Sequence, residues 1–137
     1  MDFKIKAEAA ITLCDELIHA PKYSFSELKP SKIPDAAGVY AIFNQFSGGC
    51  LYVGRTKNLR QRLYYNHLMG PLSNARLKKY LIADPFEENV VDLQSAKQYL
   101  KEQCYVQFIL EPDLLHRGQM EGLFSYFLNV RYLYEEH

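Results

Sequence analysis

A chain of 137 residues in which 48% are apolar and 14% aromatic can bury one hydrophobic core, which excludes an intrinsically disordered protein. The 16 basic and 16 acidic residues give a net charge of zero. No apolar run approaches the roughly 18 residues of a membrane-spanning helix, and charged residues interrupt the first twenty positions, so we expect neither a membrane span nor a secretory signal.

The first 35 residues predict a helix and a loop. Residues 5–20 carry apolar side chains at helical spacing, and a proline follows the last turn. Residues 22–38 contain two further prolines, which disfavour regular structure and predict a loop. We therefore expect residues 1–35 to be an N-terminal extension and residues 36–137 to form the main domain.

Two short segments after this loop predict a β-hairpin. Residues 38–43 (GVYAIF) and 50–54 (CLYVG) are rich in β-branched and aromatic residues, and the Asn and two glycines between them favour a turn. An unbulged antiparallel pairing places Tyr40 opposite Tyr52, with both rings on one face of the sheet because side chains alternate along a strand. The two tyrosines are then either a packing pair or part of a site.

The next segments predict two helices. Residues 56–68 carry two arginines, with Thr56 or Asn58 as the helix cap. Two leucines four positions apart face the core, and Arg62 lies one position off that stripe, on the flank that overlooks the hairpin. A second helix begins near Ser73, which is its expected cap.

The C-terminal half predicts a helix, a strand and a final helix. A helix from about Asp92 precedes the β-favouring run at residues 104–110, and Asp113 caps the last helix. Glu121 lies at the edge of the apolar stripe of that helix, where a carboxylate either points into a site or faces water. Together these elements predict one α+β domain with a small three-stranded, mainly antiparallel sheet flanked by helices.

Charge is unevenly distributed along this neutral chain. Residues 36–83 contain no Asp or Glu but seven cations, so this block carries +7 and the rest of the chain −7. Such a block forms a basic face that binds polyanions, although Lys and Arg are also common on solvated helix faces. We favour the basic face, and we expect nucleic-acid contacts from six of its cations: Arg55, Lys57, Arg60, Arg76, Lys78 and Lys79.

The three cysteines, Cys14, Cys50 and Cys104, are widely spaced and form no CxxC pair or Cys/His cluster. This pattern predicts neither a disulfide framework nor a structural zinc site. We therefore expect a reducing, cytoplasmic setting.

The order of elements and four motif features resemble the GIY-YIG nuclease family over about residues 36–130. Gly38-Val39-Tyr40 and Tyr52-Val53-Gly54 are similar to the two tripeptides of the family, and eleven residues separate them. Arg62 follows Tyr52 by ten positions, where the family carries an essential arginine, and Glu121 is similar to the metal-binding glutamate of the family. The resemblance implies an endonuclease that hydrolyses DNA phosphodiester bonds with Mg²⁺ or Mn²⁺ bound at Glu121.

The resemblance also implies a role for each motif residue. Tyr40 and Tyr52 would activate or orient the attacking water, with Tyr52 the first choice for the base. A tyrosine is a weak base at its free pKa of about 10, and nearby cations would lower that pKa. Arg62 offers a planar fork for phosphate oxygens, and a hard divalent cation prefers a carboxylate such as that of Glu121. His67 is a further catalytic candidate, although a lone histidine is more often a surface or capping residue.

Two positions depart from the family pattern. The family often carries His or Tyr four positions after the essential arginine, whereas this chain has Asn66 there, between Tyr65 and His67. The Asn that usually follows the glutamate by about a dozen residues is replaced by Leu133 here, and Asn129 lies four positions earlier. Both departures favour the alternative of a catalytically degenerate nucleic-acid-binding module.

The leading hypothesis is therefore a small metal-dependent endonuclease, and the second is the degenerate binding module. A third possibility is a protein-interaction domain that meets its partner through a tyrosine-rich surface. The sequence contains no helix-turn-helix or zinc-finger signature that would read base edges, so a separate targeting protein is a possible partner. The sequence sets neither the DNA substrate nor the oligomeric state.

Overall fold

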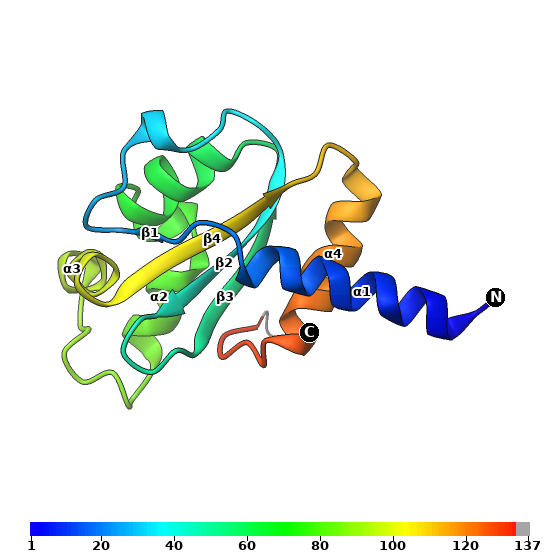
Figure 1. The fold of residues 1–137 in the computed structure, drawn as a ribbon. Helices are drawn as coiled ribbons and strands as arrows, with labels where there is room; N and C mark the ends of the chain where they lie inside the picture. The colour runs from blue at the N-terminus through cyan, green and yellow to red at the C-terminus, as the bar shows by residue number, and fades with distance from the viewer. Residues whose placement is uncertain (134–137) are drawn as a thin grey trace.

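The computed structural model describes residues 1–133, which form an α+β fold around one antiparallel sheet of four strands in the order β1-β4-β2-β3 (Figure 1). The α+β fold class is confirmed, but the prediction of three strands was wrong. The additional strand, β1, lies in the predicted loop and pairs with β4 through Tyr23 and Ser24. Two residues flanked by prolines are too short to give a periodic strand signal. The strands are β1 (Tyr23–Ser24), β2 (Gly38–Asn44), β3 (Cys50–Thr56) and β4 (Cys104–Leu110).

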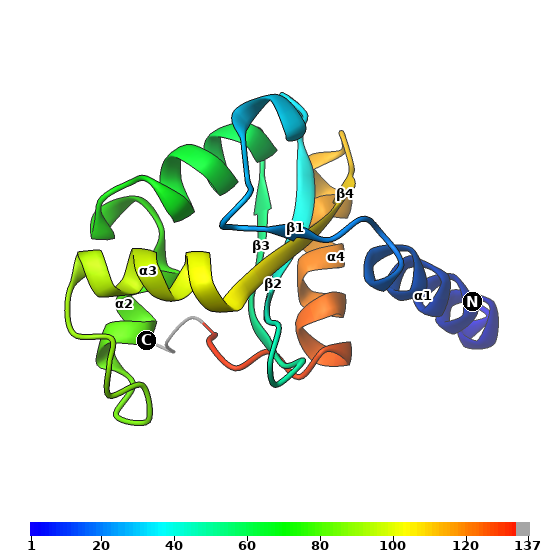
Figure 2. The ribbon, with the colours of Figure 1, turned by 60° about the vertical axis from the view of Figure 1, so that its left-hand side comes forward.

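Helices cover both faces of the sheet (Figure 2). One face carries a π-helix, η2, together with α2 and α3, and the other face carries α1 and α4. None of the helices in residues 1–133 is both long and apolar enough to cross a membrane. The helices are α1 (Phe3–Ile18), η2 (Gln61–Leu68), α2 (Arg76–Ala83), α3 (Leu93–Gln103) and α4 (Leu114–Phe127), with short 3-10 turns at η1 (Pro30–Lys32) and η3 (Leu72–Asn74).

The β2–β3 hairpin has a different register from the predicted one. Tyr40 pairs with Gly54, and Tyr52 pairs with Ile42, which is two positions from the predicted pairing. A β-bulge next to Ile42 accounts for one of these two positions. The bulge adds Leu51 to β3, so that Leu51 and Tyr52 both belong to one core cluster although they are neighbours in sequence. The prediction that Tyr40 lies opposite Tyr52 was therefore wrong. The two residues are diagonal neighbours, and their rings still lie on one face and stack, with 6.3 Å between centroids.

Helix caps were predicted with mixed success. Asp113 caps α4 through its carboxylate and a backbone N–H of the first turn, which confirms that prediction. Asp92, near which the preceding helix was expected to begin, caps α3 in the same way. Thr56 and Asn58 were the two expected caps of the helix that follows β3. Asn58 is the cap, because its side-chain oxygen accepts a hydrogen bond from the backbone N–H of Gln61 at 3.0 Å. Ser73 was predicted wrongly as a cap: it lies within η3, and α2 begins without a side-chain cap.

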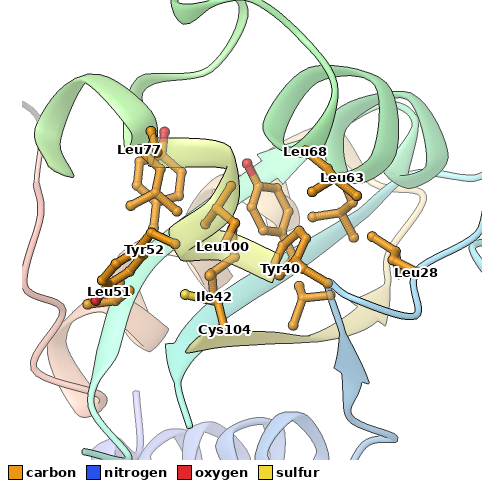
Figure 3. Close-up of a cluster of buried hydrophobic side chains, with 14 of the residues drawn as sticks. Leu28, Tyr40, Ile42, Leu51, Tyr52, Leu63, Leu68, Leu77, Leu100 and Cys104 are labelled. Atoms are coloured by element: carbon orange, nitrogen blue, oxygen red, sulfur yellow. The ribbon is translucent and has the colours of Figure 1, made fainter. Parts of the chain in front are cut away.

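The core consists of two clusters, one on each face of the sheet. The larger lies between the sheet and η2, α2 and α3, and Figure 3 shows Tyr40, Tyr52 and leucines from these helices packed within it. Phe25, Leu28 and Ile33 of the N-terminal segment are buried in the same cluster. The smaller cluster lies under α4 and the last turns of α1. The division of the chain at residue 35 stays a prediction, and the segment from Phe25 to Ile33 shares the core of the main domain.

Candidate active site

Three aromatic side chains from the motif lie together on the η2 face. Tyr40, Tyr52 and His67 are 1%, 6% and 0% exposed, and the imidazole of His67 meets both phenol rings edge-on at centroid distances of 5.4 and 5.3 Å. Their positions are fixed by packing in the larger core cluster. The structure thus brings together three of the five predicted catalytic residues, all of them almost fully buried.

His67 makes a short polar contact with Tyr40. The Nε2 atom of His67 lies 2.7 Å from the Tyr40 hydroxyl oxygen. Burial, reinforced by the charges of Arg62 and Lys78, lowers the pKa of His67 to about 3, so the ring is neutral at physiological pH. Its Nδ1 atom has no hydrogen-bond partner among the described residues. Because a buried N–H without an acceptor is rarer than an acceptor without a donor, we assign the proton to Nε2, which then donates to Tyr40.

The π-helix explains why His67, and not Asn66, reaches the tyrosines. A residue four positions after Arg62 would lie above it in an α-helix, whereas the wider turn of a π-helix brings the fifth position, His67, to that place. The side chain of Asn66 instead accepts a bond from Gln61 at 2.8 Å, and Tyr65 is 47% exposed. The sequence left Tyr65 and His67 open as substitutes at this position, and the structure places His67 there.

Gly54 allows the Tyr40 hydroxyl to lie directly against β3. A Cβ atom at this position would overlap the hydroxyl and ring carbons of Tyr40, and both residues are buried. The close packing of Tyr40 against β3 therefore requires a glycine at position 54, the second glycine of the motif. No backbone bend requires a glycine here, because Gly54 lies in a regular antiparallel pairing of β2 with β3.

Glu121 lies on α4, on the opposite face of the sheet, and meets Arg55 of β3. The Nε atom of Arg55 is 4.0 Å from Oε1 of Glu121, and the Arg55 guanidinium lies over Gly118, where a Cβ atom would overlap it. Burial raises the pKa of the Glu121 carboxyl, and the positive charges of Arg55 and Arg62 act in the opposite direction. A carboxylate with cations nearby and a quarter of its surface exposed is accessible to a ligand.

Tyr52 and Glu121 meet at the outer edge of β3, the last strand of the sheet. Both line a pocket of about 200 Å³, which we call the carboxylate pocket, together with Val53, Gly122, Ser125, Tyr132 and Leu133. The segment after α4 closes this pocket, since the backbone N–H groups of Arg131 and Tyr132 donate to Cys50 and Leu51 of β3. The edge position lets one pocket receive a side chain from each face of the sheet.

A second pocket, of about 340 Å³, lies beyond Arg55 at the end of β3. We call it the cationic pocket, and its lining residues are Arg55, Thr56, Lys57, Arg62, Leu114 and Arg117. Arg62 is held there by a bond of 2.8 Å from Nη1 to the carbonyl oxygen of Asn74. Arg117 was missed by the sequence reasoning, although its spacing of four residues before Glu121 places both on one face of α4.

The predicted nucleic-acid contacts divide into exposed and enclosed cations. The side chains of Arg55, Lys57, Arg76 and Lys79 are exposed. Lys78 is 0% exposed, and its ammonium group donates to the carbonyl oxygens of Asn66 and Gly70 at the end of η2. Lys78 has no exposed surface and lines neither pocket, so it does not fit the role of a phosphate contact. Arg60 is half-buried and donates from Nε to the Ile33 carbonyl at 3.0 Å.

The departure after Glu121, Leu133, and the nearby Asn129 also have defined places. Leu133 lines the carboxylate pocket with Glu121, so the residue at the position of the expected Asn reaches the predicted location but offers no polar atom. Asn129 is exposed and has a φ of 48°, just after the end of α4. It does not line the carboxylate pocket.

A divalent cation fits Glu121 as its one protein carboxylate. Within residues 1–133 no group of three or more His, Cys, Asp or Glu side chains is arranged to hold a metal ion. Mg²⁺ commonly binds through one or two carboxylates and keeps several waters, so a single glutamate facing a pocket is compatible with it. Glu121 would hold the ion, and Arg55 is the cation that already neutralises the carboxylate.

Comparison with known protein families gives one match. Residues 36–101 match the family model described as the GIY-YIG catalytic domain. The matched range includes Tyr40, Tyr52, Arg62 and His67, and Glu121 lies after it. No curated protein and no solved structure matches the chain.

Proposed function

Because residues 36–101 of this chain belong to the GIY-YIG catalytic domain family, a family of nucleases, we propose that the protein is a metal-dependent endonuclease that hydrolyses DNA phosphodiester bonds. One observation carries this proposal: Tyr52 and Glu121 line the same pocket, and Arg55 connects that pocket to the one lined by Arg62. A base, a carboxylate and two guanidinium groups are thereby available to one phosphate at the edge of β3.

In the proposed mechanism the arginines and the tyrosines have separate tasks. Arg62 and Arg55 bind the phosphate oxygens and neutralise the charge that develops during attack. Tyr52 accepts the proton of the attacking water, and Tyr40 is a positioning residue that packs on Tyr52 and is held by His67. Glu121 would hold a divalent cation, Mg²⁺ or Mn²⁺, which would supply Lewis acidity toward the leaving 3′ oxygen. Because the 3′ oxygen is the leaving group, cleavage leaves a 5′-phosphate and a 3′-hydroxyl.

Substrate binding rests on the exposed cations around this site. Arg55 and Lys57 lie beside the reacting phosphate, and Arg76 and Lys79 project from α2. Contacts of this type bind phosphates without reading sequence, so we propose that a separate targeting protein supplies specificity. The three cysteines, which form no disulfide, support action in a reducing compartment such as the cytoplasm.

A catalytically degenerate DNA-binding module is the second candidate, and Leu133 favours it. An apolar side chain lines the carboxylate pocket where the family carries an amide, so one polar contact to the reacting groups is lost. This candidate keeps DNA binding but not cleavage.

The experiment that tests the proposal is nicking of supercoiled plasmid in Mg²⁺ or Mn²⁺. We expect the wild type to nick the plasmid, EDTA to stop the reaction, and DNA ligase to reseal the product because both required ends are present. Arg62→Ala should abolish nicking, whereas Lys101→Ala, which removes an exposed charge at the far end of α3, should not. Salt-sensitive DNA binding without nicking would establish the second candidate instead.

A further inference from the structure

We propose that the cationic pocket binds a second phosphate, adjacent to the one that is cut, and that Arg117 and Lys57 are its contacts. This inference rests on the proposed function, because it extends the DNA contact at the same site. It adds Arg117, which the motif does not include, to the residues that hold the substrate.

The first support is the charge of the pocket. Four of its six lining residues are cations and none is an acid. Like charges gathered around one concave surface repel each other unless an anion is present, and such a surface concentrates phosphate groups. Leu114 is 64% exposed at the rim and offers an apolar surface to a sugar.

The second support is the burial of Arg117. Its side chain is 5% exposed, and its Nη1 atom donates to the carbonyl oxygens of Glu111 and Pro112 at 3.2 and 2.8 Å. Glu111 is the acid whose pKa the Arg117 charge helps to lower, but its carboxylate bonds His116 at 2.7 Å and forms no ion pair with Arg117. Among residues 1–133, Arg117 forms no ion pair. A buried cation without a paired anion is costly, and the remaining donors of the guanidinium group suit a phosphate.

The third support is the position of the pocket relative to Glu121. Arg117 precedes Glu121 by one turn of α4 on the same face, and Arg55 lies between them over Gly118. A strand whose scissile phosphate faces Glu121, Arg55 and Arg62 therefore carries its next phosphate toward Arg117. Lys57 closes the same pocket from the end of β3.

The test is the salt dependence of DNA binding in the Glu121→Gln background, which binds without cutting. A fluorescently labelled duplex is titrated at several salt concentrations, and the slope of log K against log salt reports the number of phosphates neutralised. Lys57→Gln and Arg117→Gln should each reduce the magnitude of this slope by about one. Lys101→Gln, the control of equal charge change, should leave the slope unchanged. Arg117→Lys, which keeps the charge and loses the fork, should keep the slope and bind more weakly.

The outcomes separate this inference from the proposed function. If the background variant binds DNA with a steep slope and neither Lys57→Gln nor Arg117→Gln changes it, the second phosphate site is refuted and the endonuclease proposal stands. If binding of the background variant does not depend on salt, both are refuted. Lys57 is exposed, so its substitution tests the site even where Arg117→Gln fails to fold.

Discussion

The two faces of β3 present site residues in opposite physical environments. On the η2 face, Tyr40, Tyr52 and His67 are almost without exposed surface, and His67 is neutral at physiological pH. On the α4 face, the Arg55 side chain is 49% exposed and the Glu121 side chain 25%, and both are ionic. Packing therefore determines the positions of the aromatic residues, whereas charge and a missing side chain at Gly118 determine those of the ionic residues.

This contrast predicts different consequences of substitution. Changes on the η2 face should alter stability and pH dependence, because they disturb a dense interior. Changes on the α4 face should alter DNA binding with little effect on stability, since exposed ion pairs contribute little to folding. Tyr52 belongs to both groups, because it is packed in the core and lines the carboxylate pocket.

Tyr52→Phe should produce the largest effect on activity. It keeps the ring that stacks on Tyr40 and removes the hydroxyl that acts as base. Loss of a general base reduces rates by about 100- to 10,000-fold, so single-turnover cleavage should fall within that range. Tyr126→Phe, at a 79% exposed position of α4, is the matched control and should cut at the wild-type rate. Equal rates for wild type and Tyr52→Phe would remove Tyr52 from the mechanism.

Gly54→Ala should produce the largest effect on stability. The added Cβ would overlap the Tyr40 hydroxyl, which cannot move because its ring is 1% exposed. Overpacking of this kind costs about 1–3 kcal/mol, which urea denaturation measures. The double variant with Tyr40→Leu should recover part of that loss, since the shorter side chain frees the space. An unchanged unfolding free energy in Gly54→Ala would contradict the close packing described for β2 and β3.

The acid stability of the protein should depend on His67. Its pKa is about 3 in the folded state and about 6.5 when exposed, so only the unfolded chain takes up this proton between those values. The free energy of unfolding should therefore fall as the pH drops from about 6.5 toward 3, by up to about 1.4 kcal/mol per pH unit from this group. His67→Gln keeps a donor for Tyr40 without titrating, and its stability should fall less steeply. Parallel curves for the two proteins would show that His67 is protonated in the fold.

Alanine substitutions at two glycines of α4 should produce the smallest effects, and comparing them isolates the position of Arg55. Gly122→Ala meets no atom within 4 Å, so it should raise the free energy of unfolding by up to about 1 kcal/mol through helix propensity. Gly118→Ala should gain less, because its Cβ displaces Arg55 from Glu121. It should also weaken DNA binding, which anisotropy measures beside urea denaturation. Identical stability gains with unchanged binding in Gly118→Ala would show that the position of Arg55 does not depend on Gly118.

Local signals in the sequence predicted much of this arrangement. The helix that begins near Asp92, the cap at Asp113 and the strand at residues 104–110 follow from side-chain chemistry and from β-favouring composition, and all three are present. The shared face of Tyr40 and Tyr52 also survived, because a shift of two positions in the pairing keeps the alternation of side chains.

The misses arise where tertiary structure overrides local pattern. The bulge beside Ile42 and the π-helix each insert one extra residue into a regular element, which no periodicity announces. Lys78 was expected on the basic face because it belongs to the acid-free block of residues 36–83, yet its ammonium group donates to the carbonyls at the end of η2. Arg117 was overlooked because it lies outside the motif, although the helix places it one turn from Glu121.

The central claim is that Glu121 acts in cleavage and not in folding or DNA binding. The most direct test measures plasmid nicking and duplex binding on the same preparations of wild type and Glu121→Gln, in Mg²⁺. The account predicts that Glu121→Gln binds DNA at least as tightly as the wild type, because a negative charge is removed, and that it does not nick the plasmid. Nicking by Glu121→Gln at the wild-type rate would contradict the account.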